Sequence, residues 1–206
     1  MKNNPGKCMI IKQKVDKYES IKNGERSVGK TLRHFNKDQL WRYVRALDFI
    51  AKTDTVLDYG CGVGFGSHIL SHKAQYVTGI DRNNKVIEFA NQYYKTSNMS
   101  FICKENLNIS GKYDVLVACE IIEHIKDTEK LFEEIKKMNF KRIILSVPHI
   151  SAPNNNPFHF KHFSEVAIKE HLQNIDYKIK EITTPYFSGG YAVYCVAERK
   201  EINVRL

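Results

Sequence analysis

The chain has 206 residues, of which 42% are hydrophobic and 27% are charged, and its formal net charge is +9. That length fits one α/β domain with a sizeable core and is too short for two ordinary domains, and the composition is ordinary for a globular protein. No apolar run approaches the roughly 18 to 20 residues of a membrane helix, and the Lys-rich N-terminus lacks the apolar segment of a signal peptide, so we expect a cytoplasmic protein.

The positive charge is spread along the chain and carried more by Lys than by Arg. It admits an anionic or nucleotide-linked small-molecule acceptor, or nucleic acid, but it equally fits a solvated surface. The cysteines are scattered without CxxC or zinc-like spacing, which predicts reduced thiols. They are Cys8, Cys61, Cys103, Cys119 and Cys195.

The predicted elements alternate between helix and strand after an irregular arm over residues 1–29. Helices are expected at 36–50, 66–72, 83–95, 128–138 and 164–174, and strands at 55–59, 76–80, 99–103, 113–119, 142–147, 177–184 and 191–198. Strands that alternate with helices favour a parallel sheet covered on both faces. The last two strands follow one another through a short loop, so they are expected to be antiparallel. We predict a single domain, with an arm and helix over 1–53 and a core over 54–206.

The strand at 55–59 leads from Asp58 into a loop with glycine at positions 60, 62 and 64. Glycines permit positive φ and let a ligand approach the backbone, and ligands of open sheets bind at the carboxyl ends of the strands. The dinucleotide fingerprint GxGxxG needs glycine or alanine at its sixth position, where this chain has Phe65 or Ser67, depending on the first glycine chosen. NAD binding is therefore disfavoured.

Asp81 ends the next strand, about 20 positions beyond the glycine loop. An acid at this place hydrogen-bonds a ribose diol in related loops. The alternative is that Asp81 caps the helix that follows.

A second glycine pattern, Gly24-Glu-Arg-Ser-Val-Gly-Lys-Thr31, matches the phosphate loop GxxxxGK[ST]. That loop needs a buried strand before it, and residues 16–23 are mostly polar. We do not expect a phosphate loop here.

The segment 55–67 resembles motif I of the class I (Rossmann-like) S-adenosylmethionine-dependent methyltransferases, whose pattern is hhDxGCGxG. Four more segments resemble the subfamily associated with surface-glycan biosynthesis. They are Gly24-Glu-Arg26, Trp41-Arg-Tyr43, Cys119-Glu-Ile-Ile-Glu-His-Ile-Lys-Asp127 and Asn156-Pro-Phe-His-Phe-Lys-His-Phe-Ser164. The chain departs from the family at 136–140, where Lys-Lys-Met-Asn-Phe replaces a Leu-Lys-Pro-Gly-Gly turn.

The resemblance implies a three-layer Rossmann-like sandwich with a mostly parallel seven-stranded sheet and an antiparallel C-terminal strand pair. It implies S-adenosyl-L-methionine as cofactor and S-adenosyl-L-homocysteine as product. The residues that it assigns to cofactor binding are Asp58, Gly60, Cys61, Gly62, Gly64, Asp81, Arg82, Glu105, Asn106, Cys119 and Glu120. The adenine contact is a loose match, because Glu105-Asn106 replaces the usual acidic-small pair.

Methyl transfer is a direct displacement at a sulfonium carbon, and a hydroxyl acceptor must also lose its proton. His124 is the first candidate for the base, with His159 and His162 in a loop over the acceptor, although each could be structural. Arg26, Trp41 and Tyr43 are candidates for closing the site. Trp41 would serve equally well as a core residue.

On a helical turn, Glu120, Glu123 and His124 would project to one side and could hold a divalent metal. Ubiquinone-biosynthesis and small-RNA 2′-O-methyltransferases use this segment so, the latter with a further downstream His, for which His159 or His162 would serve. The segment also occurs in metal-independent relatives, and we do not expect a metal. The predicted function is O-methylation of a sugar or another polar metabolite of surface-glycan synthesis. The alternatives are an RNA methyltransferase and a non-catalytic cofactor-binding subunit.

Overall fold

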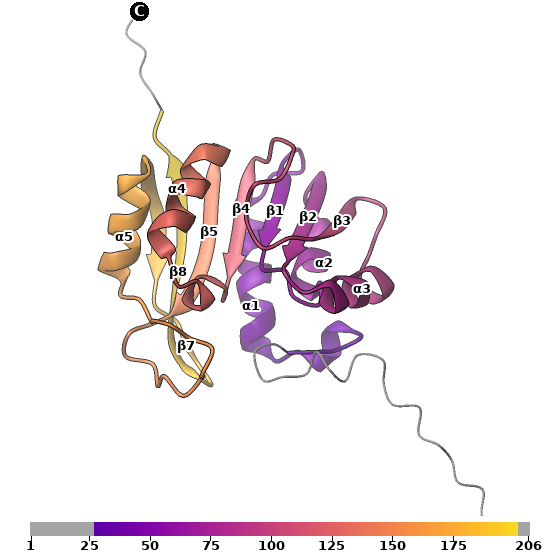
Figure 1. Cartoon of the computed structure of the whole chain (residues 1–206), viewed down its shortest axis with the longest axis horizontal. Helices are drawn as coiled ribbons and strands as arrows, with labels where there is room; N and C mark the ends of the chain where they lie inside the picture. Colours follow the sequence, from indigo (N-terminus) through magenta and orange to yellow (C-terminus); the bar gives the residue numbers. More distant parts are fainter. Residues whose placement is uncertain (1–26, 202–206) are drawn as a thin grey trace, which may run out of the picture.

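The computed structural model describes residues 27–201, so residues 1–26 of the predicted N-terminal arm, with Cys8 and the Gly24–Arg26 segment, lie outside the described residues. A central sheet carries helices on both faces (Figure 1). The strands are β1 (Thr55–Tyr59), β2 (Tyr76–Asp81), β3 (Met99–Cys103), β4 (Val115–Cys119), β5 (Arg142–Pro148), β6 (Tyr177–Thr183), β7 (Tyr186–Phe187) and β8 (Gly190–Arg199). The α-helices are α1 (Lys37–Ala46), α2 (Phe65–Ser71), α3 (Asn84–Tyr93), α4 (Thr128–Met138) and α5 (Glu165–Asn174). Short 3-10 helices are η2 (Leu32–His34), η3 (Leu47–Phe49) and η4 (Ile122–His124).

The strand order is β3-β2-β1-β4-β5-β8-β6, with β7 paired to β8. Strands β1 to β5 pair in parallel, whereas β8 is antiparallel to both β5 and β6. The predicted fold class is thus confirmed, including the antiparallel pairing of the last two long strands. The short strand β7 was not predicted, because two residues are too few for a periodic signal.

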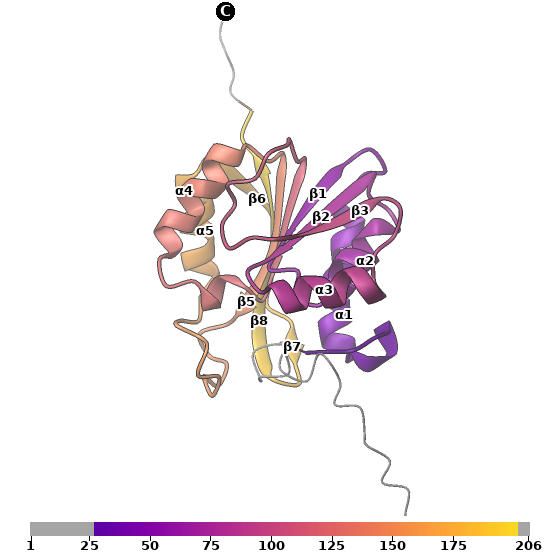
Figure 2. The same cartoon turned by 45° about the vertical axis from the view of Figure 1, so that its right-hand side comes forward.

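The two faces of the sheet are covered by different helices, α1 to α3 on one side and α4 and α5 on the other (Figure 2). Neighbouring strand residues alternate between the two cores: Val56 packs in the first and Leu57 in the second, and both are fully buried. This two-sided burial explains the continuous apolar runs of the strands.

The connection from α4 to β5 contains the segment that departs from the family pattern. Asn139 follows the helix with φ +62 and takes the left-handed position that glycine usually occupies. Phe140 is then fully buried and its carbonyl accepts a hydrogen bond from Tyr177 Oη at 2.7 Å. The turn is therefore made without Pro or Gly.

Between residues 27 and 201, none of the helices combines the length and the apolar character that crossing a bilayer demands.

Candidate active site

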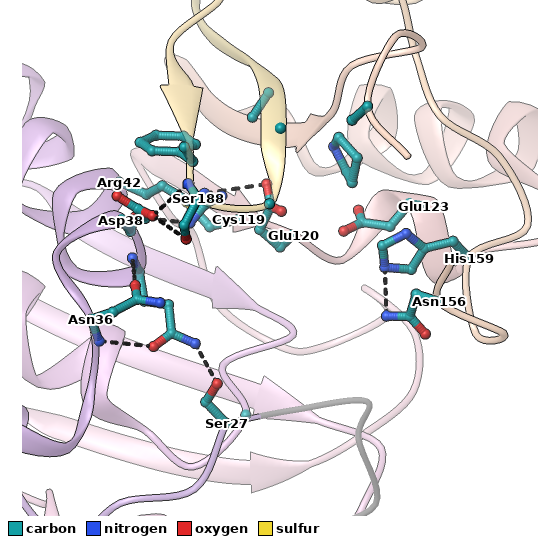
Figure 3. Close-up of a pocket in the computed structure, with 18 of the residues that line it drawn as sticks. Ser27, Asn36, Asp38, Arg42, Cys119, Glu120, Glu123, Asn156, His159 and Ser188 are labelled. Atoms are coloured by element: carbon teal, nitrogen blue, oxygen red, sulfur yellow. Dashed lines mark hydrogen bonds and ion pairs between the residues drawn. The ribbon is translucent and has the colours of Figure 1, made fainter. Parts of the chain in front are cut away.

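A cavity of about 390 Å³ lies at the carboxyl ends of β1, β4 and β5. Its wall comes from α1, the glycine loop after β1, the turn after β4, the loop after β5 and the β7–β8 hairpin. Figure 3 shows polar side chains converging from these elements. Ligands of open α/β sheets bind at this edge.

The glycine loop lines the cavity, and its glycines serve different ends. Gly60 has φ +74, and a Cβ there would lie 2.5 Å from Ile121. Gly64 is the N-cap of α2 with φ +93. Gly62 has φ +53, and a Cβ there would meet nothing within 4 Å. Gly62 is therefore the point at which a ligand can reach the backbone.

Asp58 lies beneath this loop and does not line the cavity. It is fully buried, and Ser67 Oγ donates a hydrogen bond to its Oδ2 at 2.6 Å. Burial, with a contribution from the charge of Asp81, raises the pKa of Asp58 to about 7. A cofactor role for Asp58 would thus act through the loop that it supports.

Asp81, Arg82 and Glu105 line a second, small cleft of about 50 Å³ beside Gly60. Asp81 Oδ1 accepts a hydrogen bond from Asn83 N at 2.9 Å, but the N-cap of α3 is Asn83 itself. The helix-cap alternative for Asp81 is therefore wrong, and Asp81 is a buried residue of the cleft wall. Asn106 is exposed and is not part of this wall.

The turn after β4 does not form the predicted helical turn. Glu120 takes a left-handed conformation, φ +52, and a 3-10 helix follows over residues 122–124. Glu120 Oε1 lies 3.2 Å from Arg42 Nε and accepts a hydrogen bond from Ser146 Oγ at 2.9 Å. Cys119 lines the cavity, and burial raises the pKa of its thiol.

The three candidate histidines come together from two segments. His124 Nδ1 donates to the carbonyl of Phe158 at 3.0 Å, so Nε2 is its proton-accepting nitrogen. The ring of His159 lies 4.8 Å from that of His124, centroid to centroid. His159 Nδ1 donates to His162 Nε2 at 3.0 Å, and Asn156 donates to His159 Nε2 at 2.9 Å. Burial, together with the neighbouring histidines, lowers the pKa of His159 and favours its neutral form.

Glu123 is fully buried beside these rings, and neither of its carboxylate oxygens accepts a hydrogen bond from a described residue. Burial first, and then the charge of Glu120, raise the pKa of Glu123 well above its usual range. The ligand atoms of Glu123, His124 and His159 lie within 4.8 Å of one another. Glu120 is outside this group, so the predicted set of Glu120, Glu123 and His124 is replaced by Glu123, His124 and His159.

Helix α1 and the β7–β8 hairpin supply wall residues that the sequence did not single out. Asp38 Oδ2 accepts hydrogen bonds from both the backbone N and the Oγ of Ser188, at 2.9 and 2.7 Å. The Arg42 guanidinium lies over the Phe187 ring, 4.5 Å from its centroid. In the sequence, the only indication of this part of the cavity wall was the basic residue between Trp41 and Tyr43.

Of the residues proposed to close the site, Tyr43 lines the cavity, whereas Trp41 packs edge-on against Phe187 and Tyr194 in the core. Arg26 lies outside the described residues. The described part of the phosphate-loop pattern ends at Thr31, which begins a 3-10 helix of three residues. A phosphate loop opens an α-helix, so this segment does not have the required form.

A family model described as a methyltransferase domain matches residues 50–188. A ubiquinone biosynthesis O-methyltransferase of Pelagibacter ubique is 32% identical over 108 residues, which cover 50% of this chain and 45% of that protein. The chain spans about half the length of the curated relatives it matches.

The solved structures include magnesium protoporphyrin IX methyltransferase from Synechocystis PCC 6803. With bound S-adenosylhomocysteine it superposes at a TM-score of 0.69, with 17% identity, over 89% of this chain and 94% of that one. With bound S-adenosylmethionine the values are 0.64, 22%, 79% and 77%. These likenesses establish a shared fold.

Proposed function

This chain belongs to the methyltransferase domain family, whose methyl donor is S-adenosylmethionine, and on that premise we propose that it methylates a hydroxyl oxygen of a small, hydroxyl-rich acceptor such as a sugar. The observation that carries the proposal is one cavity that joins the glycine loop to the histidine cluster. Gly62 lies in one wall, and His124, His159 and His162 lie in another.

The lining of the cavity supports a polar acceptor. Amide, hydroxyl and carboxylate groups from Asn36, Asp38, Glu120, Asn156 and Ser188 surround it. Aromatic rings complete the wall, those of Tyr43, Phe65, Phe187 and Tyr191. Hydrogen-bonding groups beside aromatic faces suit the alternating polar edges and apolar faces of a sugar ring. Because one relative is a ubiquinone biosynthesis O-methyltransferase, the proposal also includes other small hydroxylated acceptors.

Two adjoining hollows support an assignment of where the cofactor binds. We assign its amino-acid end to Gly60, Cys61 and Gly62, and its ribose to Asp81 in the small cleft beside them. Cys119 and Glu120, at the end of β4, then flank the methyl group. The chain's chief contribution is to hold the acceptor oxygen in line with the methyl carbon.

His124 is assigned the proton transfer. Its Nδ1 is fixed by the Phe158 carbonyl, which leaves Nε2 to accept the acceptor's proton as the oxygen attacks. His159, whose pKa is lowered by burial, stays neutral beside it and does not oppose the charge that His124 gains.

The same group of residues fits a divalent cation. Glu123 has a buried carboxylate with no hydrogen bond from a described residue, and it faces two imidazoles. Glu123, His124 and His159 would hold the cation in place of the proton-transfer role of His124, and the bound cation would itself orient a hydroxyl and lower its pKa. Calorimetric titration with Mg²⁺, Mn²⁺ and Zn²⁺ tests this fit, and heats that do not change in Glu123→Gln would exclude it.

The proposal is tested by methyl transfer from labelled S-adenosylmethionine to a panel of methyl glycosides, catechols and RNA. We expect labelled methyl ethers of the small hydroxylated compounds. His124→Gln should lower kcat by about 100-fold or more while leaving S-adenosylhomocysteine binding intact. His72→Gln, on an exposed position of the chain, is the matched control. Equal loss in both variants, or label in RNA alone, would contradict the proposal.

A further inference from the structure

Arg42 is a buried cation in the cavity wall, only 8% exposed. Its Nη1 donates to the backbone carbonyl of Asp38 at 2.8 Å, one turn earlier on α1. Its Nε lies 3.2 Å from Glu120 Oε1, and its guanidinium covers the Phe187 ring. Arg42 therefore joins three parts of the wall: α1, the turn after β4 and the β7–β8 hairpin.

Glu120 is fixed from both sides. Ser146 Oγ, on β5, donates to the same Oε1 atom that faces Arg42. The residue holds a left-handed backbone that a non-glycine residue adopts only when its surroundings impose it. Its side chain remains 31% exposed and lines the cavity. The carboxylate is thus rigid, yet it can still accept hydrogen bonds from a ligand.

The single Lys or Arg side chain in the described part of the cavity wall is already paired with a carboxylate. Within residues 27–201, Arg42 is the only Lys or Arg that lines the cavity, and Asp38 and Glu120 lie on the same side of it (Figure 3). An anionic group entering this space would meet carboxylates and a guanidinium that is already paired. The net charge of +9 therefore does not describe the cavity.

We propose that Glu120 binds the hydroxyls of the acceptor and that Arg42 is its positioning residue, so that the site selects a neutral, hydroxyl-rich acceptor over its anionic counterpart. This inference rests on the proposed function and specifies the substrate class. Glu120 supplies acceptor lone pairs that match hydroxyl donors. Arg42 holds the Glu120 carboxylate in place, but one guanidinium balances only one of the two wall carboxylates, Asp38 and Glu120. The remaining negative charge disfavours carboxylates and phosphates by like-charge repulsion.

The test compares matched acceptors, methyl hexosides and the corresponding methyl hexuronosides, which differ by a CH₂OH in place of a carboxylate. The measured quantity is the ratio of kcat/KM for the neutral compound to that for the anionic one. We expect the wild-type ratio to exceed about tenfold. In Glu120→Gln the guanidinium is left unpaired, so the ratio should fall by about tenfold, with a raised KM for the neutral acceptor.

For Arg42→Gln we predict the opposite change in this ratio of kcat/KM values. Loss of the cation leaves the carboxylates unbalanced, so the ratio should rise while kcat/KM for both acceptors falls. Arg45→Gln is the matched control, because Arg45 lies on the same helix and pairs with Glu181 at 2.7 Å outside the cavity wall. Its ratio and its S-adenosylhomocysteine affinity should equal those of the wild type.

A purely structural role would lower activity on both acceptors alike, and then the ratios in Glu120→Gln and Arg42→Gln would not move in opposite directions. That result would overturn the inference and leave the proposed function standing. A wild-type enzyme that binds S-adenosylhomocysteine but methylates none of the sugars would overturn the choice of a sugar acceptor, and this inference with it.

Discussion

Asp58 is a carboxyl group whose ionisation is suppressed by the fold. Its pKa of about 7 in the folded protein lies above the ordinary value near 4, so between these pH values the unfolded chain is ionised while the folded one is protonated. This group therefore lowers stability as pH rises from about 4 to 7. The contribution is separable because Asn keeps the shape of the side chain and does not titrate.

We predict that the free energy of unfolding of Asp58→Asn, relative to wild type, rises by at least about 1 kcal/mol between pH 4.5 and pH 8. Urea unfolding of both proteins at the two pH values measures it. Ser67→Ala is a control that removes the hydrogen bond from Ser67 to Asp58 but keeps the titrating carboxyl group of Asp58. A difference that is independent of pH would show that Asp58 is already ionised in the folded protein.

Two glycines in the same segment should respond differently to alanine. At Gly62 a Cβ meets nothing within 4 Å, whereas at Gly66 it would lie 2.1 Å from Tyr43 Cζ. We expect Gly62→Ala to cost about 1 to 2 kcal/mol of stability from its positive φ, and to weaken S-adenosylhomocysteine binding by about tenfold or more. Gly66→Ala should destabilise by about 1 to 3 kcal/mol through overpacking.

Thermal unfolding and calorimetric titration separate the two effects. Gly62→Ala that binds S-adenosylhomocysteine as tightly as wild type would show that the cofactor does not approach the loop there.

The site residues that could be predicted from the sequence are those indicated by their position next to a predicted strand. The glycines at 60, 62 and 64 and the acid at 81 each stand at a fixed place relative to a strand end. Arg42 and Glu120 were not recognised as a pair, because the contact joins residues 78 positions apart in number and nothing in either segment indicates it. Glu123 matters to the candidate site because its carboxylate is buried, and residue spacing in the sequence does not indicate burial of this kind.

At the scale of elements, the long strands were predictable because each is a short apolar run bounded by turns. The turn after β4 was not, since its prediction assumed a regular helix through Glu120, and the left-handed backbone there rotates that side chain toward Arg42. The three histidines converge because the loop after β5 is bound to this turn. Phe160 N donates to the Glu123 carbonyl at 2.8 Å, beside the bond from His124 to Phe158.

The β7–β8 hairpin is held over the cavity by Asp38 and Ser188. Both hydrogen bonds end on one carboxylate oxygen, and they hold the pKa of Asp38 below its usual range. We predict that Asp38→Asn increases amide exchange across residues 186–192 by about five- to tenfold, because charge-assisted bonds are replaced by weaker ones. Hydrogen exchange read by mass spectrometry measures it.

Asp48→Asn is the control, since Asp48 lies in η3, beyond the C-terminal end of α1, and pairs with Arg45 there. An unchanged hairpin in Asp38→Asn would mean that the Trp41 and Arg42 contacts with Phe187 suffice to hold it.

At the scale of the whole molecule, the fold brings the ends of β1, β4 and β5 to one edge and places the glycine loop and the histidines around one cavity. The net charge of the chain does not predict the electrostatics of this site. Lysines spread over the surface account for the net charge, whereas the cavity wall carries paired charges. Acceptor choice resides in the loops around the cavity and does not transfer with a fold.

We propose that this chain methylates small hydroxylated molecules with S-adenosylmethionine. The most direct measurement is transfer of labelled methyl by the purified protein into an extract of the organism that makes it, separated by size with and without ribonuclease treatment. We predict ribonuclease-resistant label in small or glycan material, as methyl ethers, with one S-adenosylhomocysteine formed per methyl group. Label confined to a ribonuclease-sensitive polymer would contradict the account and identify RNA as the acceptor.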